Sequence, residues 1–136
     1  MSQRATRIVV IEDDLDMRDA IRDILAPEGY DVECFLTGPA GLEALRRDPP
    51  DLLLLDIMLA TPSQGFHLAY EMKDDARLKD IPIIMISAIG QRMGMDYMRE
   101  LGTEYMPAEA FLEKPLSAKT LREAVHRVVQ GARARQ

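Results

Sequence analysis

Acidic side chains directly follow two apolar runs of this sequence. Glu12 and Asp13 come after the run at 8–11, and Asp56 comes after the run at 52–55. Carboxylates that lie close together repel one another, so such a group is costly unless a cation neutralises it. Mg²⁺ fits this ligand set better than Ca²⁺, which needs more protein oxygens. Acidic residues also favour helix N-termini, so the first pair alone does not distinguish a metal site from a helix start.

Two further polar residues stand at the ends of later apolar runs. Ser87 precedes the small residue Ala88, and Lys114 precedes Pro115. Taken singly, each is typical of a loop. Together with an acidic nucleophile and a metal site, a hydroxyl and an ammonium group are the parts that handle a phosphoryl group, because that chemistry depends on charge neutralisation and positioning. The set of residue types therefore indicates phosphoryl chemistry.

Short apolar runs alternate with longer amphipathic stretches along the chain, which is typical of βα units around a parallel sheet. Five rounds predict strands at 7–11, 32–35, 52–55, 83–86 and 110–112. The first, third and fourth runs are almost wholly apolar, which predicts central strands covered by helices on both faces. Five such units are compatible with a doubly wound α/β fold of the flavodoxin-like kind, with five parallel strands in the order 2-1-3-4-5. In that fold the ligand crevice lies outside the carboxyl ends of strands 1 and 3, where the acidic residues stand.

The spacing of apolar residues predicts the connecting helices. They cover 17–25, 38–47, 64–77, 94–101 and 117–129. Thr37 is expected to cap the second helix, and Gly29 to follow the first in a C-terminal cap position. We expect one domain over 1–136, with a core at about 7–129 and a frayed polar tail at 131–136.

Composition excludes several classes of protein. Seventeen Lys and Arg against 23 Asp and Glu give a net charge of -6, which opposes direct binding to nucleic acid and to anionic membranes. The single cysteine, Cys34, cannot form an internal disulfide. No apolar run reaches the roughly 18 residues that a membrane-spanning helix requires. We therefore expect a cytoplasmic protein.

The four strand-end motifs, taken in order, resemble the receiver domain of two-component response regulators. They read IVVIEDD at 8–14, LLLDIML at 53–59, ISA at 86–88 and FLEKP at 111–115. The resemblance covers nearly the whole chain, from about residue 7 to 129. It implies a phosphoacceptor signalling domain rather than an enzyme.

The resemblance also assigns roles to the acidic residues. Asp56 would be the phosphoacceptor that attacks the phosphorus of a phosphohistidine on a sensor histidine kinase or a phosphotransfer protein. Asp13 and Asp56 would bind Mg²⁺ directly, and Glu12 would act largely through water. The backbone carbonyl of Met58 would complete the protein's ligands.

Other residues would bind the phosphoryl group and pass on the signal. Lys114 and Ala88 would contact the phosphoryl group, and the peptide bond between Lys114 and Pro115 would be cis. Ser87 and Phe111 resemble the family's switch pair, which reshapes the surface of the fourth helix, fifth strand and fifth helix on phosphorylation. That surface would control a downstream protein effector and is a candidate for a phosphorylation-dependent homodimer.

The sequence departs from the family pattern in two informative places. Met58 and Ile89 are apolar where the family's hydrolytic water passes, which predicts slow autodephosphorylation. The stretch between Ser87 and Phe111 is several residues longer than is common, with the excess around 103–109. This stretch is rich in methionine, which suits adaptable binding surfaces but also fills gaps in a core.

Two other functions compete with this interpretation. A phosphatase of the haloacid-dehalogenase type also uses a strand-end aspartate with Mg²⁺, but it needs a second acid at the position of Met58. A phosphorylation-independent docking module of receiver fold is the remaining alternative, against which the intact Asp13, Asp56, Ser87 and Lys114 argue.

Overall fold

The computed structural model describes residues 5–56, 64–87 and 108–134 of the chain. Its strands are β1 (Arg7–Ile11), β2 (Asp31–Phe35), β3 (Leu52–Asp56), β4 (Ile83–Ser87) and β5 (Ala110–Glu113). Its helices are α1 (Leu15–Leu25), the short 3-10 helix η1 (Ala26–Glu28), α2 (Gly38–Arg47), α3 (Gln64–Lys73) and α5 (Ala118–Ala134). The helix predicted at 94–101 lies outside the described residues.

The strands form one parallel sheet in the order β2-β1-β3-β4-β5, which confirms the predicted topology. The three apolar runs are the three central strands. β2 and β5, whose runs are shorter or less apolar, are the edges. This placement follows from burial, because a central strand has both faces covered while an edge strand is partly exposed.

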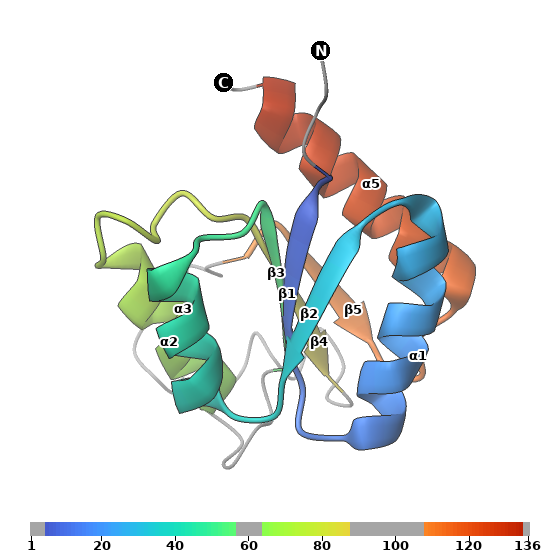
Figure 1. Cartoon of the computed structure of the whole chain (residues 1–136), viewed down its shortest axis with the longest axis horizontal. Coiled ribbons are helices and arrows are strands. Elements are labelled where there is room, and N and C mark those ends of the chain that lie inside the picture. The colour runs from blue at the N-terminus through green and yellow to red at the C-terminus, as the bar shows by residue number, and fades with distance from the viewer. Residues whose placement is uncertain (1–4, 57–63, 88–107, 135–136) are drawn as a thin grey trace.

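Helices cover both faces of the sheet, with α2 and α3 on one side and α1 and α5 on the other (Figure 1). Successive strand residues point to opposite faces. Val9 and Ile11 therefore pack in the core beneath α2 and α3, and Ile8 and Val10 pack in the core beneath α1 and α5. In the part of the chain that the structure describes, no helix combines the length and apolar character needed to cross a membrane.

Two helix ends differ from the prediction. α3 ends at Lys73 and not at 77, because the side chain of Asp75 accepts a hydrogen bond from the N–H of Arg77 at 2.8 Å, a local bond that competes with the helix. α5 continues to Ala134, four residues into the segment expected to fray. Alanine and arginine favour helix, which explains the extension.

The predicted cap of α2 is confirmed, whereas Gly29 ends the short helix η1 and not α1, whose C-cap is Ala26. Thr37 Oγ1 accepts a hydrogen bond from the N–H of Ala40 at 3.2 Å at the start of α2. Gly29 has a φ of 92° and ends η1, a conformation that favours glycine. These local signals place the turn from η1 into β2 and the start of α2 after β2.

Candidate functional site

The carboxyl ends of the strands bring the predicted residues to one edge of the sheet. Glu12 follows β1, and its N–H continues the pairing with β2 by donating to Phe35 O at 3.0 Å. Asp56 and Ser87 are the last residues of β3 and β4. The prediction placed each of them directly after its strand, so both strands are one residue longer than predicted. Lys114 follows β5, and its N–H donates to Ser87 O at 2.8 Å.

Three carboxylates converge at this edge. Ligand oxygens of Glu12, Asp13 and Asp56 all lie within 4.8 Å of one another. Glu12 is 1% exposed and Asp56 is 3% exposed, whereas Asp13 is open to solvent. Two buried acids and one exposed acid form an oxygen-only donor set with access from outside, which fits a hard divalent cation such as Mg²⁺.

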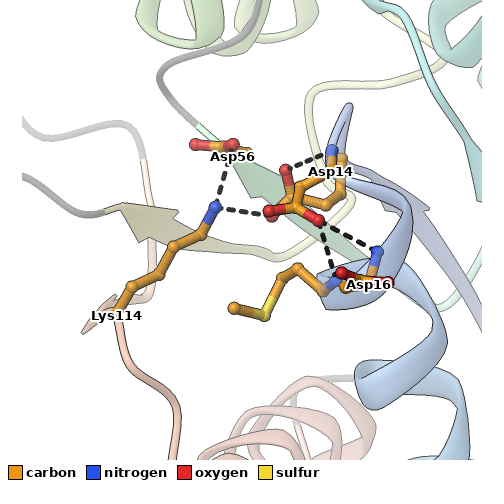
Figure 2. Close-up of polar contacts among 6 residues, drawn as sticks. Asp14, Asp16, Asp56 and Lys114 are labelled. Carbon is orange, nitrogen blue, oxygen red and sulfur yellow. Dashed lines mark hydrogen bonds and ion pairs between the residues drawn. The ribbon is translucent and has the colours of Figure 1, made fainter.

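Lys114 reaches into this acidic cluster from the loop after β5. Its Nζ lies 2.8 Å from Glu12 Oε1 and 3.3 Å from Asp56 Oδ2 (Figure 2). The ammonium thus bridges carboxylates that come from two different strands. Among the described residues, one cation faces three acids, so the cluster keeps an excess of negative charge.

Burial and charge perturb the proton affinity of these groups. Burial, together with the neighbouring Asp56, raises the pKa of Glu12 from 4.5 to about 7 in spite of the opposing effect of Lys114. Burial by itself lowers the pKa of Lys114, but contact with Glu12 and the charge of Asp56 outweigh it, so the net pKa of Lys114 is raised. Both shifts indicate a site that is short of positive charge.

Ser87 and Phe111, the predicted switch pair, occupy contrasting positions. Ser87 is fully buried at the end of β4. Phe111, in β5 beside Met85, is partly buried and packs against the core beneath α2 and α3. The bond between Lys114 and Pro115 is cis, as the resemblance implied.

The predicted metal ligand Met58 and the predicted phosphoryl contact Ala88 lie outside the described residues. So do Ile89 and the methionine-rich stretch at 93–106.

Sequence reasoning missed two contacts at the site. Lys114 was assigned to the phosphoryl group alone, but it also contacts Glu12. Asp14 stands at a position where an acid favours a helix start, and its N–H also donates to Glu12 Oε2 at 3.2 Å. The helix-start pattern was the only signal for Asp14, because the direction of the Glu12 side chain depends on the tertiary fold.

Comparisons with known proteins agree with this geometry. A family model described as the response regulator receiver domain matches residues 8–126. The polar-differentiation response regulator DivK of Brucella ovis is 30% identical over 119 residues, which cover 87% of this chain and 91% of that protein.

Solved structures show the same fold. A CheY-like response regulator receiver domain protein from Methanospirillum hungatei has a TM-score of 0.82 at 23% identity, covering 98% of this chain and all of that chain. NtrX from Brucella abortus, solved in complex with ADP, has a TM-score of 0.79 at 27% identity, covering 97% of this chain but only 28% of that chain. With the acidic cluster, the lysine and the family match in agreement, this chain belongs to the response regulator receiver family.

Proposed function

We propose that this protein accepts a phosphoryl group on Asp56 from a phosphohistidine of a sensor kinase or phosphotransfer protein, in a Mg²⁺-dependent reaction. The convergence of Glu12, Asp13 and Asp56, with Lys114 bridging two of them, is the observation that carries this proposal. An Asp56 oxygen would attack the phosphorus while the bond from phosphorus to the donor's histidine nitrogen breaks. The product is an acyl phosphate on Asp56.

The residues at the site would have different roles in this transfer. Glu12, Asp13, Asp56 and the carbonyl of Met58 would hold Mg²⁺, which when bound supplies positive charge to a site that lacks it. Lys114 already lies 3.3 Å from Asp56 Oδ2, so its ammonium is placed to pair with a phosphoryl oxygen on the same side chain. The burial of Asp56 strengthens these electrostatic interactions.

The change at Asp56 would reach the surface through β4 and β5. Ser87, at the end of β4, is hydrogen-bonded through its carbonyl to Lys114, and Phe111 lies in the adjoining β5. Movement of the Ser87 hydroxyl toward the phosphoryl group would therefore shift β5 and α5. We propose that the surface formed by β5 and α5 binds a downstream protein effector or a second phosphorylated copy. The stretch at 93–106 would take part in this binding.

Intact-mass measurement after incubation with acetyl phosphate tests the proposal without knowledge of the partner. We expect one phosphoryl group per chain, dependent on Mg²⁺ and absent in Asp56→Asn. Asp51→Asn is the matched control, because Asp51 is an exposed aspartate just before β3. It lies at the amino-terminal end of that strand, and Asp56 lies at the carboxyl end. If neither acetyl phosphate nor a phosphorylated kinase modifies Asp56, the chain acts instead as a phosphorylation-independent docking module.

A further inference from the structure

Asp14 connects the acidic cluster to the first turn of α1 (Figure 2). Its Oδ1 accepts hydrogen bonds from the N–H of Asp16 at 2.9 Å and of Met17 at 3.2 Å, which makes Asp14 the N-cap of α1. Its own N–H donates to Glu12 Oε2 at 3.2 Å. The same residue therefore holds the start of the helix with its side chain and the buried acid Glu12 with its backbone.

These bonds hold the backbone on both sides of Asp13. Before it, the N–H of Glu12 is bonded to β2. After it, Asp14 is held by its capping bonds and by its carbonyl, which accepts from the N–H of Arg18 at 2.9 Å. The Asp13 side chain is exposed and so lacks the packing that orients a buried group. Its direction toward the cluster therefore depends on the backbone that Asp14 holds.

We infer that Asp14 is a positioning residue for the metal site and sets the affinity for Mg²⁺ through Glu12 and Asp13 without binding the ion. This inference rests on the proposed function, because it requires that the acidic cluster bind Mg²⁺. The physical reason is pre-organisation. A cation binds more tightly when its carboxylates are already held in place, and removal of such supporting bonds typically weakens metal binding by about 10- to 100-fold.

Four variants separate positioning from charge and from general stability. Asp14→Ala removes both the cap and a negative charge, whereas Asp14→Asn removes the charge and retains a capping oxygen. Asp16→Ala removes an exposed acid of the same turn and leaves the cap in place. Thr37→Ala removes the cap of α2, so it controls for the loss of a helix cap away from Glu12.

The dissociation constant for Mg²⁺ would be measured by isothermal titration calorimetry, at a temperature where urea unfolding shows every variant to be folded. We expect Asp14→Ala to bind at least about tenfold more weakly than the parent. Asp14→Asn and Asp16→Ala should stay within about threefold of the parent, since only a solvent-screened charge is lost. Thr37→Ala should bind like the parent even though a cap is lost.

Three outcomes would overturn the inference. Equal binding by Asp14→Ala and Asp16→Ala would show that the cap does not position the ligands. Equally weak binding by Asp14→Asn and Asp14→Ala would assign the effect to charge. Weak binding by Thr37→Ala would assign it to stability. A parent protein that binds no Mg²⁺ would instead contradict the metal site of the proposed function, which keeps the two failures distinct.

Discussion

Replacement of Glu12 by glutamine should stabilise the metal-free protein in a pH-dependent way. The Glu12 carboxyl is buried, and its pKa is raised from 4.5 to about 7. Below pH 4.5 the carboxyl is protonated in both the folded and the unfolded chain. As the pH rises from 4.5 to 7 the unfolded chain loses its proton first, so the folded state loses stability across this window.

The size of this loss follows from the two pKa values. It is about 1 kcal/mol at pH 5 and on the order of 3 kcal/mol at pH 8, where the carboxylate is ionised in both states. Glutamine is similar in shape but cannot ionise. The attraction between Glu12 and Lys114, which glutamine loses, is already included in the raised pKa. We therefore expect Glu12→Gln to raise the free energy of unfolding by roughly 2 to 3 kcal/mol at pH 8 and by less than about 1 kcal/mol at pH 5.

Urea unfolding in EDTA, followed by circular dichroism because the chain has no tryptophan, measures both values. Glu43→Gln is the matched control, since Glu43 is exposed on α2 and should show no change at either pH. A gain that is equal at the two pH values would refute the reasoning. A loss of stability at pH 8 would also refute it, because the ion pair with Lys114 would then outweigh the cost of burying the charge.

Three further predictions concern other contacts. Lys114→Met should lower the free energy of unfolding of the metal-free protein by about 2 kcal/mol, measured with urea, because the buried acids lose their cation. The same variant should bind Mg²⁺ more tightly in calorimetry, because the ammonium competes for the same oxygens. Gly41→Ala should cost about 1 to 3 kcal/mol in urea unfolding, since a Cβ at this position would lie 2.3 Å from Cδ1 of Ile11. A Met58→Asn, Ile89→Glu double variant should shorten the half-life of the acyl phosphate, measured as loss of the mass adduct after donor removal, because polar groups can orient the attacking water.

Two of these predictions have a matched control variant, and the third has an outcome that would contradict it. Lys119→Met, at an exposed lysine of α5, should change neither stability nor Mg²⁺ binding, and an equal effect there would contradict the role of Lys114. Ile11→Ala removes Cδ1 and Cγ1 of Ile11, the two atoms that Gly41→Ala would strike, so an undiminished cost in that background would show another cause. An unchanged half-life in the double variant would contradict the prediction of slow autodephosphorylation.

The amino-acid sequence is enough to predict the order and type of the described strands and α-helices, and the strand ends at which the site residues stand. Wholly apolar runs identify central strands because both of their faces must be buried. Thr37 and Gly29 identify helix boundaries because capping is a local interaction within a few residues. Asp56, Ser87 and Lys114 could be found for the same reason, since each is adjacent in sequence to an apolar run that marks a strand.

How the site residues interact depends on contacts that form only when the chain is folded. The burial of Glu12, and with it a pKa near 7, depends on neighbours from β2, β3 and the loop after β5. The double contact of Lys114 depends on the packing of strands that are far apart in sequence. The role inferred for Asp14 likewise depends on where the Glu12 side chain turns. Local patterns record which residues begin or end an element, but charges and side-chain directions are set by contacts between elements, which no local pattern contains.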